Sequence, residues 1–289
     1  MGEPLAQAAA ALGRRVVRSD PVSGGCITDT RRVVLDDGTV VFCKLDASPP
    51  PELFEAEAAG LRWLRAPGAI AVPKVLAVGE QFLVTEWVEP GRAHVATDEL
   101  LGRGLALLHR AGAERFGRIR DGRSYLATLE LPDDAASTWG AFWVLGRVRP
   151  LAELAVRRNA LPSAVLRTVD RLAERIDALA GPPEPPSRVH GDLWSGNVHV
   201  DRDGRPWLVD PSAHGGHRET DLAMLALFGG FDMKRVIAAY EEVAPLADGW
   251  RDRVALHQLV PLLAHVVLFG SGYVASTRDA FAEYLDPGF

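Results

Sequence analysis

Three polar residues in the second half of the chain have the types and spacing that phosphoryl transfer requires. Asp192 and Asn197 lie five positions apart in the stretch HGDLWSGN, and Asp210 follows thirteen residues after Asn197. The residues between Asn197 and Asp210 predict two short strands around the turn 201–204, and such a hairpin would bring the two side chains together. Two neighbouring oxygen ligands suit Mg²⁺ held against nucleotide phosphates, and the upstream carboxylate of Asp192 suits a base that faces a hydroxyl.

The spacing of Asp192 and Asn197 matches the catalytic loop of protein kinases, H-R-D-L-x-x-x-N. Gly191 stands where a protein kinase has Arg, and Asp210 is followed by Pro-Ser instead of Phe-Gly. That arginine is typical of kinases that are switched by a phosphorylated activation loop, so its absence predicts a constitutively assembled small-molecule kinase. The alternative is a polar hairpin without chemistry, which leaves three matched residues in the correct order unexplained.

A lysine and a glutamate in the first third of the chain predict an ion pair that holds nucleotide phosphates. Lys44 is one of three lysines and lies in the alternating run 40–45, which predicts a strand with Lys44 among apolar neighbours. Glu57 is the charge within the apolar stripe of a predicted helix at 52–65. Because a buried carboxylate needs a partner, we expect Lys44 to pair with Glu57. The alternative is a solvent-directed Lys44 and a surface Glu57.

Glycines between the predicted strands 15–22 and 31–36 are a second candidate contact with phosphate. Gly24 and Gly25 would let backbone N–H groups approach phosphate oxygens. A Gly-Gly pair is more often only a turn, and the G-x-G-x-x-G spacing is absent. Cys26 follows in the same turn, where an exposed thiol could be oxidised or joined to the same cysteine of a second chain, or be inert.

The stretch HGDLWSGN, followed by DPSAHGGHRETDLAM at 210–224, resembles the fructosamine kinase (ketosamine-3-kinase) family. The resemblance runs from Ser23 to about Tyr273, so it covers nearly the whole chain. The Leu-Trp-Ser-Gly insert makes the octapeptide far more specific than the general kinase pattern. Members of this family share the fold of choline kinases and aminoglycoside phosphotransferases, and the resemblance implies that fold here.

The resemblance also implies roles for the motif residues. Asp192 would accept the proton of the attacking hydroxyl, while Asn197 and Asp210 would bind Mg²⁺. Lys44 would steady the phosphates of ATP. His190 is expected to orient the loop rather than to exchange protons.

Further positions are implied to bind adenine, to support the loop or to contact the acceptor. In this fold the segment between the lobes binds the adenine edge through backbone groups, which places the base near Glu86, Trp87 and Val88. Asp221 resembles the helix-borne aspartate that ties down the catalytic loop from beneath. Trp194 could stack on a sugar or ketose backbone, or it could lie in the core.

The predicted fold is α+β and bilobal, with a small β-rich N-terminal lobe that carries one key helix and a larger, mainly helical C-terminal lobe. A Pro-Gly break after the predicted strand 81–88 sets the boundary, with lobes at 1–89 and 90–289. Thr97 is expected to cap the first helix of the second lobe. Apolar periodicity predicts the helices of this lobe at 97–110, 139–158, 163–180, 219–228, 232–243 and 251–269.

Composition narrows the class of protein and of partner. The chain has 289 residues, and its net charge of −6 argues against nucleic acid or an anionic membrane as a partner. Two cysteines form no disulfide framework, and we find neither a signal peptide nor about 18 uninterrupted apolar residues. These features predict a cytoplasmic protein.

The sequence therefore predicts a kinase that uses ATP and Mg²⁺ to phosphorylate a ketosamine hydroxyl, by resemblance the 3-hydroxyl. Fructosamine or ribulosamine adducts, free or attached to lysine or protein, are the expected acceptors, and His217 in the segment 214–219 is expected to contact them. One alternative is a kinase of the same fold for an aminoglycoside, choline or another alcohol, which acidic clusters such as Asp133-Asp134 would favour. The other is an inactive nucleotide-binding module. The oligomeric state stays open.

Overall fold

Alternating apolar residues in the first third of the chain build a five-stranded antiparallel sheet. The computed structural model describes residues 2–22, 28–286 and 288–289. The strand order is β1-β2-β3-β5-β4. The strands are β1 (Val16–Pro21), β2 (Asp29–Leu35), β3 (Val40–Leu45), β4 (Val75–Gly79) and β5 (Phe82–Glu86). In the central strand β3, Val41 and Cys43 face one core while Lys44 faces the other side, as the alternation predicts.

The described residues of this part of the molecule form two helices where the sequence predicted one. Helix α1 (Glu3–Ala11) has Pro4 in its first turn and continues through an alanine-rich run, which favours helix strongly. Its Leu5 and Ala8 pack against Val41 and Leu45 on one face of the sheet. The helix escaped prediction because alanine gives only a weak amphipathic signal.

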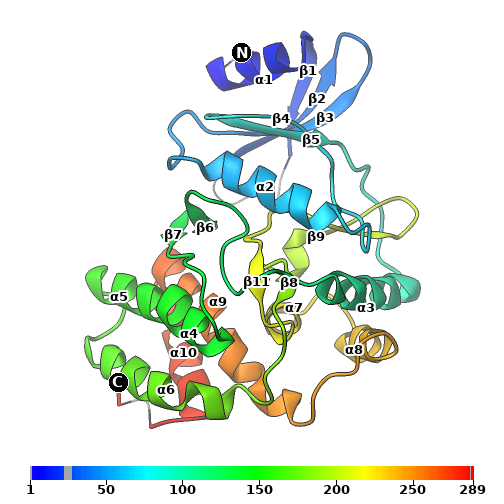
Figure 1. Cartoon of the computed structure of the whole chain (residues 1–289). Helices are drawn as coiled ribbons and strands as arrows, with labels where there is room; N and C mark the ends of the chain where they lie inside the picture. The colour runs from blue at the N-terminus through cyan, green and yellow to red at the C-terminus, as the bar shows by residue number, and fades with distance from the viewer. Residues whose placement is uncertain (1, 23–27, 287) are drawn as a thin grey trace.

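Helix α2 (Leu53–Arg65) covers the other face of the sheet and lies between it and the helical part, as Figure 1 shows. Its Phe54, Ala58, Leu61 and Leu64 are buried in a core shared with α3 (Val95–Arg110), α7 (Glu219–Phe228) and α8 (Met233–Glu241). The prediction of a helix at 52–65 with an apolar stripe is therefore confirmed. Because α2 contacts both parts, it links the sheet to the loop that carries Asp192.

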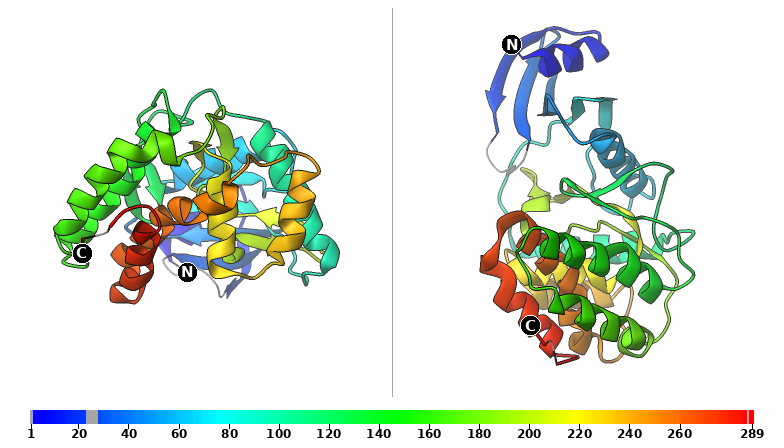
Figure 2. Two further views of the ribbon diagram at one scale, coloured as in Figure 1. Left: turned by 90° about the horizontal axis from the view of Figure 1, so that it is seen from below. Right: turned by 90° about the vertical axis from the view of Figure 1, so that its left-hand side faces the viewer.

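The rest of the chain is mainly helical, and the right-hand view of Figure 2 shows it stacked below the sheet. The predicted α+β, kinase-like class is confirmed, while the division at residues 89 and 90 stays a prediction. The further helices are α4 (Trp139–Trp143), the π-helical turn η1 (Val144–Val148), α5 (Arg149–Arg157), α6 (Ala164–Leu179), η3 (Trp250–Arg253), α9 (Val254–Phe269), η4 (Ser271–Tyr273) and α10 (Val274–Ala282).

Three two-stranded antiparallel ladders shape the loops of this part. β9 (Val198–Val200) pairs with β10 (Pro206–Leu208), directly after the single turn η2 (Ser195–Asn197), as the sequence predicts. The sequence did not predict β6 (Ser124–Leu126) with β7 (Leu129–Leu131), nor β8 (Ser187–Val189) with β11 (His214–Gly216). Strands of three residues are too short to display an alternating pattern.

The start of α3 differs from the prediction by two residues. The helix begins at Val95, with His94 and not Thr97 in the capping position. Thr97 Oγ1 accepts a hydrogen bond from the His94 N–H (3.0 Å) and donates one to the Gly204 carbonyl (2.7 Å). Thr97 therefore closes a capping box and joins α3 to the turn between β9 and β10.

Residues Trp250–Phe269 are long and apolar enough to cross a membrane. However, 61% of their most apolar window is buried inside the structure. Leu256, Leu259, Leu263 and Val266 lie in a hydrophobic core with α5, α6 and α10. This burial is typical of a core helix.

Candidate active site

The hairpin β9–β10 brings together the three polar residues that the sequence singles out. Asn197 Nδ2 donates hydrogen bonds to the carbonyl of Asp192 (2.8 Å) and to its Oδ2 (3.1 Å). The Val209 N–H donates to the Asn197 carbonyl (3.0 Å), which holds Asp210 at the end of the hairpin beside Asn197. The sequence-predicted arrangement is therefore present in the structure.

Asn197 and Asp210 offer the donor atoms that Mg²⁺ prefers. Because Asn197 Nδ2 is used within the loop, its Oδ1 remains as an acceptor. The side chain of Asp210 is 39% exposed, so its carboxylate is open to a ligand. Asp210 also has a φ of 56°, a left-handed backbone that is uncommon for a residue with a side chain and often marks a functional position. The donor set fits a magnesium ion held by these two residues.

Asp192 has the electrostatic surroundings of a general base. Burial and then the negative charge of Asp210 raise its pKa to about 7, although the hydrogen bond from Asn197 and the charge of Lys44 oppose the shift. A carboxylate with a raised pKa binds a proton more readily, which suits a group that removes one from a hydroxyl near neutral pH. Asp192 lines a cavity, so an acceptor can reach it.

Lys44 contacts two carboxylates at once. Its Nζ lies 2.8 Å from Glu57 Oε1 and 2.8 Å from Asp210 Oδ1, and its side chain is 9% exposed. Burial alone would lower the pKa of Lys44, but Asp210 and Glu57 raise it above its ordinary value. The pairing of Lys44 with Glu57 is confirmed. The contact with Asp210, which the sequence did not predict, connects this pair to the candidate metal ligands.

The loop 190–197, which carries Asp192 and is called the catalytic loop below after its proposed role, is anchored from beneath by α7. The fully buried carboxylate of Asp221 accepts hydrogen bonds from the backbone N–H groups of His190 (2.7 Å) and Gly191 (2.9 Å), and from His109 Nε2 (3.1 Å). His190 Nε2 donates to the Val209 carbonyl (2.8 Å). Burial lowers the pKa of His190, which suits a neutral residue that orients the loop. The contacts of His190 and Asp221 are those expected of supporting residues.

Backbone geometry explains why glycine stands where protein kinases have arginine. Gly191 has a φ of 80°, in the left-handed region that favours glycine. A Cβ atom on Gly191 would lie 2.1 Å from the Ser212 carbonyl oxygen. An arginine therefore does not fit this loop.

The cavity beside Asp192 extends from the sheet to helix α9. Trp194 lines it, and its ring lies edge-on to Phe228 with 6.2 Å between centroids. The cavity has two other walls, which the sequence did not predict because nothing in their local spacing points to Asp192. One of them could have been suspected from His265, a polar residue within the apolar helix 254–269. These walls are formed by the β6–β7 hairpin and by α7 and α9, through Tyr125, Ala127, Thr128, Met224, Pro261, His265, Leu268 and Phe269.

The segment expected to bind adenine has its side chains occupied elsewhere. Glu86 Oε1 accepts a hydrogen bond from the Lys74 N–H (2.7 Å), and Trp87 Nε1 donates to Glu89 (2.8 Å). Adenine binding by the backbone of Glu86, Trp87 and Val88 stays a prediction. Gly24, Gly25 and Cys26, at 24–26, lie outside the described residues.

His217 is not among the residues that line the cavity, and its contact with the acceptor stays a prediction. It is 5% exposed, and its ring packs against Trp139 (5.2 Å between centroids) and His257 (5.0 Å). Its Nδ1 accepts a hydrogen bond from the Glu219 N–H (3.2 Å). His217 directly follows β11, which pairs with β8.

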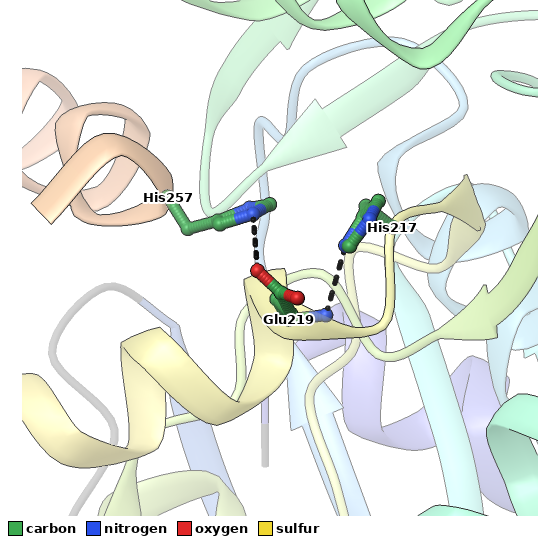
Figure 3. Close-up of side chains that lie close together, drawn as sticks. All are labelled: His217, Glu219 and His257. Carbon is green, nitrogen blue, oxygen red and sulfur yellow. Dashed lines mark hydrogen bonds and ion pairs between the residues drawn. The ribbon is translucent and has the colours of Figure 1, made fainter. Parts of the chain in front are cut away.

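Figure 3 shows His217 and His257 on either side of Glu219, a grouping that resembles a set of metal ligands. Glu219 is already bound by Arg253, which donates to both of its oxygens (2.9 and 2.6 Å). Burial alone would raise the pKa of Glu219, but His257 and Arg253 hold it at about 2. The guanidinium supplies the positive charge that a metal would bring, so the group is a buried ion pair flanked by histidines.

The comparison with known families agrees with the geometry of the site. The family model described as fructosamine kinase matches residues 4–287. The chain belongs to the fructosamine kinase family. Members of this fructosamine kinase family are phosphotransferases with an alcohol acceptor, so the chain is an enzyme of this class, and the kinase family implies the use of ATP.

Two named relatives align with most of this chain. The "Probable ketoamine kinase" of Thermus thermophilus is 39% identical over 265 residues, which is 91% of this chain and 92% of the relative. The chloroplastic protein-ribulosamine 3-kinase of Oryza sativa subsp. indica is 33% identical over 276 residues, 91% of this chain and 78% of the relative.

Solved structures show the same fold. A structure from Thermobifida fusca, described as that of a "putative fructosamine-3-kinase", has a TM-score of 0.89 and 42% identity, and the match covers 96% of each chain. The choline kinase LicA from Streptococcus pneumoniae has a TM-score of 0.67 at 14% identity, and covers 97% of this chain and 98% of its own. The second likeness shows a shared fold and carries no information about the acceptor.

Proposed function

We propose that this enzyme uses ATP and Mg²⁺ to phosphorylate the 3-hydroxyl of a ketosamine, such as a fructosamine or a ribulosamine. The observation that carries the proposal is the cavity in which Asp192, Asn197 and Asp210 lie beside Trp194. The names of the relatives, ketoamine kinase and ribulosamine 3-kinase, support this class of acceptor.

The proposed mechanism assigns one task to each polar group. Asp192 takes the proton of the acceptor hydroxyl while the oxygen attacks the γ-phosphorus and ADP leaves. Lys44, oriented by Glu57, binds phosphate oxygens. Asn197 and Asp210 would hold Mg²⁺, which offsets the negative charge of the phosphates when bound.

The surface of the cavity favours an acceptor with few positive charges. Among the described lining residues, the carboxylates are Glu57, Asp192 and Asp210, all of which have catalytic tasks in this proposal. An aminoglycoside would need an acidic cluster such as the pair 133–134. Asp133 of this pair lies outside the cavity and is bound to Arg147 (2.8 Å). The described lining of the cavity therefore offers no further carboxylate to a polycationic drug.

Turnover of defined acceptors tests the proposal. Purified enzyme with Mg-ATP should phosphorylate fructosyl-lysine or ribulosyl-lysine, and NMR of the product should place the phosphate on carbon 3. Free fructose, choline and kanamycin should react poorly, and EDTA should stop the reaction. Trp194→Ala should raise the acceptor KM well before it alters the KM for ATP, because stacking affects only the acceptor.

Other results would replace parts of the proposal. Preferred turnover of fructose, choline or kanamycin would overturn the ketosamine assignment while leaving the kinase mechanism. ATP binding without turnover of any acceptor would instead favour an inactive nucleotide-binding module. A cytoplasmic location is also proposed here, because two cysteines without a disulfide framework suit a reducing compartment, and cell fractionation would test it.

A further inference from the structure

Helix α9 contributes one polar ring to an otherwise apolar wall of the cavity. His265 lines the cavity together with Pro261, Leu268 and Phe269 of the same helix and Met224 of α7. Among the described residues that α7 and α9 contribute to the lining, His265 is the polar one. The described lining residues of α7 and α9 include no carboxylate, so a donor group on an acceptor meets a different partner at this wall.

The orientation and the tautomer of His265 are set by its neighbours. Nδ1 lies 2.7 Å from the Pro261 carbonyl oxygen. Because a carbonyl can only accept, the proton of the neutral ring is on Nδ1 and the lone pair is on Nε2. The ring also packs against Phe228 (4.8 Å between centroids), Tyr273 (4.8 Å) and Phe269 (5.2 Å). No described group hydrogen-bonds to Nε2.

This wall has the features that recognise a single ammonium group. Burial lowers the pKa of His265, although the Pro261 carbonyl opposes the shift, so the ring stays neutral near pH 7 and keeps its acceptor. Phe269, 54% exposed, offers an aromatic face beside it, and such a face attracts a cation. A ketosamine differs from a simple ketose in its secondary amine, which is protonated near neutral pH and offers two N–H donors.

We propose that His265 is a specificity-determining residue, whose Nε2 accepts a hydrogen bond from the protonated secondary amine of the acceptor. This inference rests on the proposed ketosamine kinase function and adds a residue that selects for the amine. A simple ketose would leave Nε2 without its partner. An aminoglycoside would bring several ammonium groups to a wall with one acceptor.

Two acceptors that differ only at the amine test the proposal. One is the fructosamine of Nα-acetyl-lysine, and the other is its ether analogue, in which oxygen replaces the nitrogen. We expect His265→Leu to raise the KM for the fructosamine by about 10- to 100-fold, the range of a hydrogen bond to a charged group. The ratio of the fructosamine KM to the ether KM should rise at least about tenfold. His265→Gln, which retains an acceptor oxygen, should restore part of this preference.

A variant elsewhere on α9 controls for a loosened helix. Gln258 donates to the Ala223 carbonyl (2.9 Å) and lies outside the cavity lining, so Gln258→Leu weakens the contact of α9 with α7 without removing a cavity group. This control should change the KM of both acceptors by the same factor, and circular dichroism should show that all variants fold.

The outcomes separate the inference from the function on which it rests. Turnover of the fructosamine by the wild type, with His265→Leu raising both KM values equally, would overturn the role of His265 and leave the kinase function intact. Failure of the wild type to phosphorylate the fructosamine would overturn both. A selective rise for the fructosamine, reduced in His265→Gln, supports the inference.

Discussion

Lys44 is the residue at which the proposed nucleotide site and the proposed metal site meet. Its ammonium group is shared between Glu57 and Asp210, both at 2.8 Å, and little of it reaches solvent. Burial raises the pKa of Glu57, while Lys44 opposes that shift. Removing the lysine would therefore leave two carboxylates without their shared cation, so we expect these residues to act as a unit.

The first prediction tests this unit by a double-mutant cycle. Lys44→Met should lower kcat/KM severely, and Glu57→Gln should lower it less, because the lysine touches the phosphates and the glutamate only orients it. The double variant should be far from additive, since the second change removes a group whose partner is already lost. Steady-state kinetics of the four proteins measures the coupling. Independent, additive losses would refute the unit.

The second prediction separates the base from the metal ligand. Asp192→Asn should lower kcat by about 10²- to 10⁴-fold with little change in the KM for ATP, because it removes a proton acceptor and no phosphate contact. Asp210→Asn should instead raise the KM for Mg-ATP and increase the Mg²⁺ concentration needed for half-maximal rate. Equal, mild effects of both substitutions would show that these roles are misassigned.

At the scale of elements, α7 controls the shape of the catalytic loop through one side chain. Burial alone would raise the pKa of Asp221, but hydrogen bonds from His109 and Gly191 hold it below its ordinary value. The ionised carboxylate is thus matched to the three donors around it. Because two of those donors are backbone N–H groups of the loop, the position of α7 is transmitted directly to Asp192.

The third prediction concerns this anchor. Asp221→Ala should lower the free energy of unfolding by about 3 kcal/mol, since it leaves buried N–H groups without an acceptor. It should also reduce kcat, because the loop loses its support. The exposed helix cap Asp232, which accepts from the Lys234 N–H (3.0 Å), is the control: Asp232→Ala should cost about 1 kcal/mol and leave kcat unchanged. Urea unfolding and kinetics measure both, and a full kcat in Asp221→Ala would contradict the anchor.

The sequence could predict an element where its contacts are made by residues that lie close together along the chain. The hairpin β9–β10 was predictable because its turn and both strands lie within about a dozen residues, and the spacing of Asn197 and Asp210 depends on it alone. The ladder β8–β11 was not, because it pairs Ser187 with Gly216 across the whole catalytic loop. Pairs this distant leave no local pattern in the sequence.

In the whole molecule, the active site likewise has one part that local sequence patterns predict and another part that depends on long-range contacts. The catalytic end of the cavity lies on local motifs and on one strand-to-helix pair, and the sequence predicted its residues. The wall of α9 reaches the site only because α9 packs on α7, so His265 gave no signal beyond being polar in an apolar helix. The burial of His217 was hidden for a related reason, since this residue follows a strand whose pairing is long-range.

The last prediction comes from histidines buried in the helical part. Burial and then the charge of Arg147 lower the pKa of His214 to about 4, and burial and then His257 lower that of His217 to about 3. The unfolded chain binds protons on these groups below about pH 6.5, whereas the folded protein does not, so stability is complete above that pH and falls as the pH drops toward the folded values.

Between pH 7.5 and 5.5 each such histidine should therefore cost about 1.4 kcal/mol of unfolding free energy. His217→Gln removes one titrating group, and its loss of stability over this range should be smaller than that of the wild type by about that amount. Glu219, with its pKa of about 2, does not contribute here, because its stabilisation is lost only below about pH 4.5. Urea unfolding at both pH values decides the matter, and equal losses in the two proteins would mean that His217 gains its proton in the folded state.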